Sequence, residues 1–76
     1  MEPAEVERLI EERVEGATAT VRRARGEHDD DHLQAEVTAP AFEGLSLVEQ
    51  HELVYDALEE HMTTDIHALE LKTRTP

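Results

Sequence analysis

Residues 41–62 read AFEGLSLVEQHELVYDALEEHM, and this stretch decides the fold. A turn at Gly44 is followed by Ser46, three residues before Glu49, which is the capping-box spacing that starts a helix. Beyond this start, apolar residues recur at intervals of three and four, and this periodicity predicts one inward helix face. We expect that face to consist of Val48, His51, Val54, Tyr55, Leu58 and Met62.

Size and composition limit the rest of the chain to a single small domain. Its 76 residues suffice for one core, so we expect one domain over residues 1–76. Cysteine is absent, which excludes disulfides and thiolate ligands from this chain. The sequence shows neither an apolar run long enough for a membrane span nor the features of a signal peptide. We therefore predict a cytoplasmic protein.

The charge balance is strongly acidic. The formal net charge is −12, with 19 acidic residues spread along the chain and a single lysine, Lys72. Periodic apolar positions argue against disorder, so we interpret the charge as the solvated surface of a folded domain. Such a surface suits a very salty cytosol, because molar salt shortens the range of charge repulsion to a few ångströms. A halophilic source is a hypothesis from composition, and it predicts a marginal fold in dilute buffer.

The flanking segments predict one further helix and three strands. Pro3 suits a first helical turn, and an apolar stripe follows it up to a stop at Gly16. Residues 17–22 and 33–38 alternate apolar and polar side chains, which is typical of half-buried strands joined by a polar loop. A short turn or helix after Met62 leads to a third strand over residues 66–73. The predicted order is α-β-β-α-α-β, an α+β fold with helices on one face of a three-stranded sheet.

Five histidines are the residues most capable of special chemistry. His51 on the inner stripe and His61 at the helix end have structural roles as their simplest interpretation. His67, at the entry of the last strand, suits either a buried hydrogen-bond partner or a ligand. His28 and His32 flank three aspartates, which indicates either a solvated acidic loop or a divalent metal site.

Catalytic patterns are weak in this sequence. Ser46 is better explained as a helix cap than as a nucleophile, and its nearest histidine in sequence, His51, forms no motif with it. No glycine-rich phosphate loop is present. We do not expect an enzyme.

Several separated motifs carry a resemblance to a known family. They are F-E-G-L at 42–45, H-E-L-V-Y at 51–55, I-H-A-L at 66–69, T-R-T-P at 73–76 and D-H-L at 31–33, where leucine replaces the usual phenylalanine. Together, in this order, they resemble the BolA family from about Val14 to the end of the chain. The resemblance implies an α-β-β-α-α-β fold similar to the class II KH arrangement, in agreement with the periodicity.

The resemblance also implies a partner and a cofactor. BolA-like proteins pair with monothiol glutaredoxins, and the pair can hold a bridging [2Fe–2S] cluster together with glutathione. Carried over to this chain, the ligands are His67 and, from the loop, His28, with His32 in reserve. The implied role is an adaptor in iron–sulfur cluster assembly, trafficking or iron and redox sensing, while the isolated chain is a cofactor-free monomer or weak homodimer. The short acidic loop departs from the family pattern and bears on docking and metal choice.

Two alternatives remain open from the sequence. The family is also associated with regulation of gene expression, so a DNA-binding transcriptional regulator of the stress response is one. Its basic contacts would be Arg22, Arg23 and Arg25, but no G-x-x-G loop is visible and the net charge repels phosphates. The other is a protein-interaction domain whose histidines bind no metal.

Overall fold

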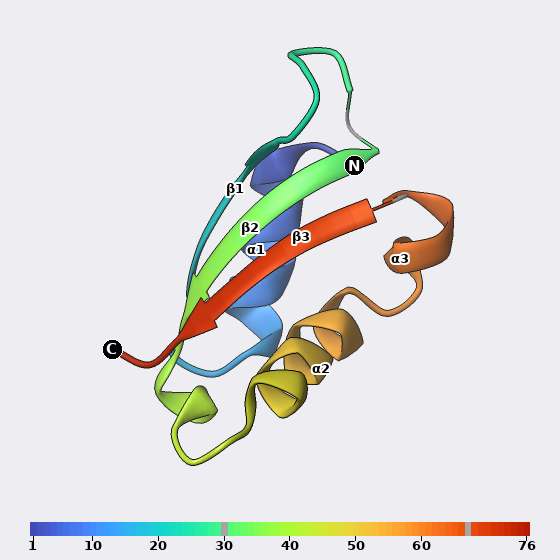
Figure 1. Cartoon of the computed structure of the whole chain (residues 1–76). Coiled ribbons are helices and arrows are strands. Elements are labelled where there is room, and N and C mark those ends of the chain that lie inside the picture. The colour runs from blue at the N-terminus through green and yellow to red at the C-terminus, as the bar shows by residue number, and fades with distance from the viewer. Residues whose placement is uncertain (30, 67) are drawn as a thin grey trace.

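A computed structural model describes residues 1–29, 31–66 and 68–76, and for residues 63 and 64 it describes the backbone alone. Its elements follow the predicted order of helices and strands (Figure 1). They are α1 (Pro3–Arg13), β1 (Thr18–Arg23), β2 (His32–Thr38), the 3-10 turn η1 (Pro40–Phe42), α2 (Leu47–Leu58), α3 (His61–Thr64) and β3 (Ala68–Arg74).

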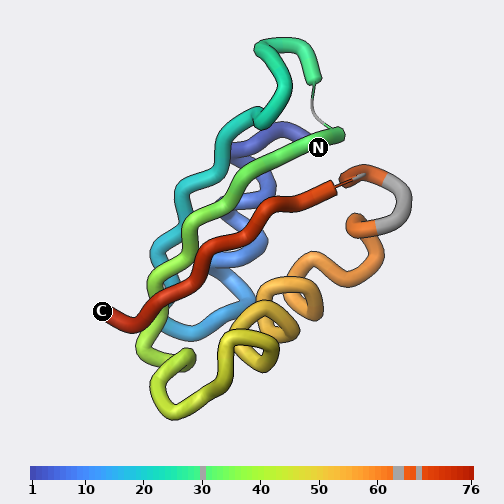
Figure 2. The backbone as a smooth tube through the Cα atoms, viewed as in Figure 1, coloured from blue at the N-terminus to red at the C-terminus, as the bar shows by residue number. Residues whose placement is uncertain are grey.

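The strands form one mixed sheet in the order β1-β2-β3. β1 runs antiparallel to β2, pairing Arg23 with Leu33, whereas β3 runs parallel to β2, pairing His32 with Ala68. Figure 2 shows the three strands side by side, with β2 in the middle. Because β2 and β3 are parallel, both strands start at the same end of the sheet. This shared end positions the candidate site.

The core lies between the sheet and the helices. α1 packs against β1 and α2, and α2 packs against α1 and β3. Alternation in the first two strands is confirmed, because their predicted inward residues are buried or partly buried while their neighbours are more exposed. The fully buried side chains of largest volume are Phe42, Ile10, Leu33, Leu58, Ile66, Val6, Val37 and Val54.

The helix α1 ends earlier than its glycine. Its last residue is Arg13, and the N–H of Val14 closes the final turn on the carbonyl of Ile10. Gly16 then takes a φ of +72°, and a Cβ at this position would lie 3.0 Å from Cδ of Pro40. A side chain there would therefore meet both backbone strain and the turn after β2.

The start of α2 is confirmed, but the predicted inward face is wrong at two positions. Ser46 Oγ accepts from the N–H of Glu49 at 3.2 Å, and Glu49 Oε1 accepts from the N–H of Ser46 at 2.9 Å. This second bond lowers the pKa of the Glu49 carboxyl. However, Val48 is 67% exposed and Tyr55 is 37% exposed.

The buried residues of α2 are Val54, Ala57 and Leu58. The main neighbours of the helix are α1 and β3, with a smaller contact to α3. These neighbours cover a narrow stripe, and Leu47, Val48 and Tyr55 lie at the surface. Periodicity alone gives the direction of a helix face but not how much of it a neighbour covers.

The outward edge of β1 is closed by α1. Glu11 Oε2 accepts from the N–H of Ala19 at 3.0 Å, and Glu7 Oε2 accepts from the N–H of Val21 at 2.7 Å. Ala24 donates to the carbonyl of His32, which puts the even-numbered residues of β1 on the β2 side and the odd-numbered ones on the outer side. The two carboxylates therefore satisfy backbone groups that the sheet leaves unpaired.

Candidate functional site

The candidate site lies where β2 and β3 begin. His32 is the first residue of β2 and pairs with Ala68, the first residue of β3. The N–H of Ala68 also donates to the carbonyl of Asp31 at 2.9 Å, which joins the loop before β2 to the start of β3. His67, the predicted first ligand, directly precedes Ala68 in the sequence and lies outside the described residues. Its role as a ligand stays a prediction.

The His32 ring is held by a carboxylate. Its Nδ1 lies 3.1 Å from Oδ2 and 3.3 Å from Oδ1 of Asp29. A carboxylate on one ring nitrogen is the contact that commonly orients a metal-bound histidine through its other nitrogen. The same contact also serves simply to fix the loop.

Asp29 organises the turn that leads into β2. Its Oδ1 accepts from the N–H of Asp31 at 2.8 Å and from the N–H of His32 at 3.1 Å. The bond from Asp31, together with those from His32, lowers the pKa of the Asp29 carboxyl. The carboxylate form is thus favoured at the position where it contacts the imidazole.

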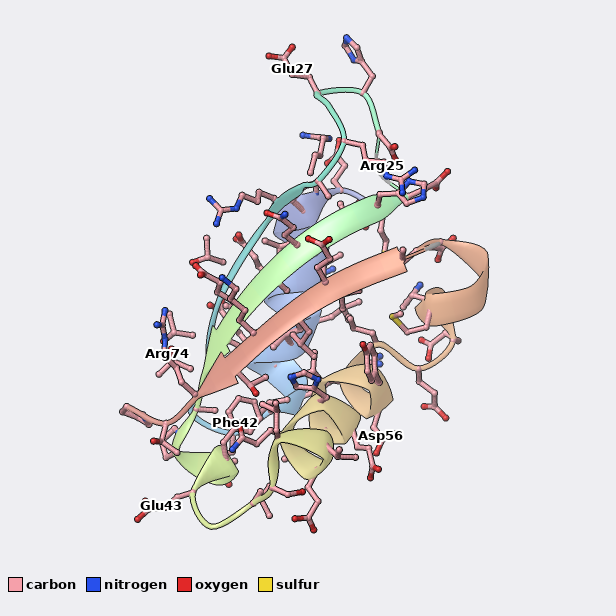
Figure 3. All side chains as sticks on the ribbon, viewed as in Figure 1. Arg25, Glu27, Phe42, Glu43, Asp56 and Arg74 are labelled. Carbon is pink, nitrogen blue, oxygen red and sulfur yellow. The ribbon has the colours of Figure 1, made fainter. Side chains whose placement is uncertain are left out.

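His28 occupies a different setting. It is exposed in the loop that connects β1 to β2, next to Glu27, whose side chain points away from the body of the protein at the loop tip (Figure 3). The structure thus brings His32 to the start of β3 and leaves His28 on an exposed loop. Which of the two is the second ligand stays a prediction.

The remaining histidines have local contacts. His61 Nδ1 lies 2.5 Å from Asp65 Oδ2, and its Nε2 lies 3.3 Å from Glu60 Oε1. His51 is partly buried and lines a groove beside Leu71, which agrees with the structural role predicted for it. Its Nε2 is buried and has no hydrogen-bond partner among the residues that the structure describes, a feature that the sequence did not reveal.

The donor set limits what this chain binds alone. Within residues 1–29, 31–66 and 68–76, no three His, Asp or Glu side chains gather as a metal site. A group held by two imidazoles of this chain would therefore need further ligands from outside that set.

The three arginines proposed for nucleic-acid contact do not converge. Strand alternation puts Arg22 on the exposed face of β1 and Arg23, which is partly buried, on the other face. Arg22 lines a hollow together with Glu36 and Glu70. Arg25 lies beyond the strand in the connecting loop (Figure 3). Nucleic-acid binding stays a prediction that this arrangement does not favour.

Comparison with known proteins gives the family. The family profile described as BolA-like protein matches residues 8–76. The chain belongs to the BolA family. Among solved structures, a BolA homologue from Coxiella burnetii is 38% identical with a TM-score of 0.83, covering 100% of this chain and 92% of that one.

Curated relatives of this BolA-like chain are longer proteins. Protein BOLA1, chloroplastic, of Arabidopsis thaliana is 36% identical over 77 residues, which cover 100% of this chain and 46% of the relative. SufE-like protein 1, chloroplastic/mitochondrial, of the same plant is 36% identical over 58 residues, which cover 76% of this chain and 16% of the relative. The BolA-like chain thus spans about half, or less, of the length of these two relatives.

The comparisons leave the predicted location untested. The two plant relatives are named for organelles, and that naming applies to them alone. In the described part of this BolA-like chain, no helix is long and apolar enough to cross a membrane. A cytoplasmic location stays a prediction.

Proposed function

We propose that this BolA-like chain is an adaptor that pairs with a monothiol glutaredoxin and shares a [2Fe–2S] cluster with it, in cluster assembly, trafficking or iron and redox sensing. The observation that carries the proposal is the parallel register of β2 and β3. It sets His32 opposite Ala68, the residue after His67, at one end of the sheet. The start of β2 at His32 and the residue that follows His67 in the sequence thus meet at that end.

The residues of the chain fit a shared cluster. His67 and one of His28 or His32 would supply imidazoles, and the thiolates would come from the glutaredoxin and glutathione, since this chain has no cysteine. When bound, a cluster with imidazole ligands carries less negative charge and a higher potential than one with thiolates alone. Asp29 supports the His32 choice, because its carboxylate orients that ring through Nδ1.

The test is reconstitution with a monothiol glutaredoxin, glutathione, iron and sulfide, read by visible circular dichroism. We expect the wild-type chain to convert the spectrum of the glutaredoxin's own homodimer into a new one. His67→Ala should restore the homodimer spectrum, and either His28→Ala or His32→Ala should do the same. His61→Ala is the matched control, because the His61 ring, on α3, is engaged by Asp65 just after that helix.

Two results would contradict the proposal. If the wild-type chain never alters the glutaredoxin spectrum, the two proteins do not share a cluster. If His67→Ala keeps the new spectrum, His67 is not a ligand of the cluster. Asp29→Asn separates the loop candidates, since it should weaken the spectrum only if His32 is the second ligand.

A further inference from the structure

The outer edge of β3 carries backbone groups that the sheet does not use. The N–H of Ala68 and the carbonyl of Arg74 both bond toward the β2 side, to Asp31 and Ala39. In a parallel ladder the direction alternates along the strand. The N–H and C=O groups of Leu69, Leu71 and Thr73 therefore point away from β2.

Nothing in the described part of the chain accepts from these three N–H groups. The Thr73 side chain is engaged, because its Oγ1 donates to Gln50 Oε1 at 2.7 Å, but its backbone is not. Figure 1 shows β3 as the front edge of the sheet, opposite the edge formed by β1. Such an unpaired edge is a template for another strand.

One flank of α2 forms a wall beside this edge. Leu47, His51 and Tyr55 are four residues apart and so share one side of the helix. Leu47, which is 60% exposed, and His51 line a groove of about 370 Å³ together with residues 71–74 of β3. The wall is mostly apolar, and it includes His51, whose buried Nε2 has no hydrogen-bond partner among the described residues. A strand added at the edge would bury its helix-side residues here.

The charges on the solvent face of β3 indicate which charges a strand bound at its open edge should carry. The exposed residues of β3 are Ala68, Glu70, Lys72 and Arg74, of which the last three carry charge. Although the chain has 19 acidic residues, no described carboxylate lies within ion-pair distance of Lys72 or Arg74. Acidic residues directly opposite these two would form favourable cross-strand pairs.

We propose that the β3 edge binds an extended segment of a partner protein as a fourth strand of the sheet. The segment has apolar residues at alternate positions, facing Leu47 and His51, and acidic residues opposite Lys72 and Arg74. A second copy of this chain is a poorer occupant, because pairing would bring together two molecules of net charge −12. This surface goes beyond the cluster function, since it needs no metal and uses the outer edge of β3 along residues 69–74 rather than the start of β2.

A synthetic peptide tests the surface directly. The probe is acetyl-Glu-Val-Glu-Val-Lys-Val-amide, which in antiparallel register sets glutamates opposite Arg74 and Lys72 and lysine opposite Glu70. The control peptide exchanges every glutamate and lysine. At about 0.15 M salt the long-range field is largely screened. What remains of that field favours the control, so preference for the probe reports local pairing.

Amide hydrogen exchange is the first readout. In the free chain, the N–H groups of Leu69, Leu71 and Thr73 should exchange faster than those of Glu70 and Lys72. The probe should slow the three outward amides, and the control peptide should do so more weakly. Equal exchange along β3 in the free chain, or no slowing by millimolar probe, would overturn the proposal.

A pair of substitutions at one position is the second readout. Thr73→Pro and Thr73→Ala both remove the hydroxyl bond to Gln50, but only proline also removes the outward N–H. We expect Thr73→Pro to weaken probe binding by about tenfold, the equivalent of one hydrogen bond, and Thr73→Ala by less than about threefold. Circular dichroism checks that both variants fold. Concentration-dependent dimers that protect the same amides without peptide would overturn the partner segment in favour of a second copy.

Discussion

The first and third strands form the two edges of one sheet. The helix beside β1 offers hydrogen-bond acceptors to the outward N–H groups of its strand, whereas the helix beside β3 does not. Along β1, the flank of α1 carries Glu7 and Glu11, whose carboxylates accept from outward N–H groups. Along β3, the flank of α2 carries Leu47 and His51 instead, and the outward N–H groups meet no described acceptor. The choice of residue on one side of a helix therefore decides whether an edge is closed or open to a partner.

Proline placed at successive positions of β3 gives the largest expected effect and tests the comparison most directly. Lys72→Pro removes an N–H that bonds toward β2, so the free energy of unfolding should fall by about 3 kcal/mol. Thr73→Pro removes an outward N–H that has no described acceptor, and it should cost about 1 kcal/mol, chiefly through the lost hydroxyl bond to Gln50. Urea denaturation measures both, with Lys72→Ala as the control for the exposed side chain. Equal losses would mean that the two amides do not point in opposite directions.

Removal of the two carboxylates that close the β1 edge should destabilise the fold. The double variant Glu7→Ala/Glu11→Ala should lose about 2 kcal/mol of unfolding free energy, because two outward N–H groups of β1 lose charged acceptors. The matched control is Arg8→Ala/Glu12→Ala, an exposed ion pair on the same helix at 3.3 Å, which should change stability by less than about 0.5 kcal/mol. A loss no larger than that of the control would show that β1 needs no closure.

Salt separates the edge contacts from the overall charge. With a net charge of −12, wild-type stability should rise by about 1–2 kcal/mol between dilute buffer and molar KCl, because repulsion is screened. The variant Glu52→Lys/Asp56→Lys, which carries less net charge, should respond less. Glu7→Ala/Glu11→Ala should respond almost as the wild type does, since its lost bonds are short-range. Equal stability at both salt levels would contradict the salt-adapted interpretation of the composition.

The capping box controls the helix that borders the open edge. Ser46→Ala should lower the free energy of unfolding by about 1 kcal/mol, because the N–H of Glu49 loses its acceptor. Fraying at Leu47 should also weaken the peptide probe, whereas Ser46→Asp, which keeps a capping oxygen, should preserve both properties. Thermal denaturation and probe titration measure the two effects. If Ser46→Ala lowers stability but leaves probe binding unchanged, the α2 wall does not contribute to peptide binding at the β3 edge.

The smallest expected effect concerns the loop that connects the edge strand β1 to the central strand β2. The folded pKa of Asp29 lies below its usual value of 3.8, so its bonds stabilise the fold above that pH and are lost as the pH falls through the folded pKa. Asp29→Asn should therefore be less stable than the wild type at about pH 6, and the difference should shrink near pH 3. Urea midpoints at the two pH values provide the measurement. A difference that stays constant with pH would show that ionised Asp29 does not support the turn.

Much of this fold was predictable because it depends on local patterns. The inward residues of α1, β1 and β2 alternate or recur with the correct period, and the capping box at Ser46 fixes where α2 starts. The third strand starts at Ala68 rather than at residue 66, since the N–H of Ile66 bonds back to the carbonyl of His61 and its side chain is buried in the core. Such a bond depends on α3, whose short length gives little periodic signal.

The candidate site was less predictable, because it depends on contacts between segments that local sequence patterns do not encode. Sequence spacing presents His28 and His32 as similar flanks of an acidic run, but only His32 has its ring held by Asp29 and pairs with Ala68. Glu7 and Glu11 look like solvent-facing flanks of an apolar stripe. Their four-residue spacing is a weak signal, because edge closure depends on where β1 lies beside the helix.

The parallel pairing of β2 with β3 also sets an order of assembly. β1 and β2 are neighbours in the sequence, whereas β3 pairs with β2 from 36 residues further along the chain. Local pairings form faster than such distant ones, so we expect α1, β1 and β2 to associate first. Until residues 68–74 arrive, β2 is itself an edge strand with Leu33, Ala35 and Val37 along it. During synthesis on the ribosome, the growing sheet is therefore most prone to aggregate just before β3 emerges.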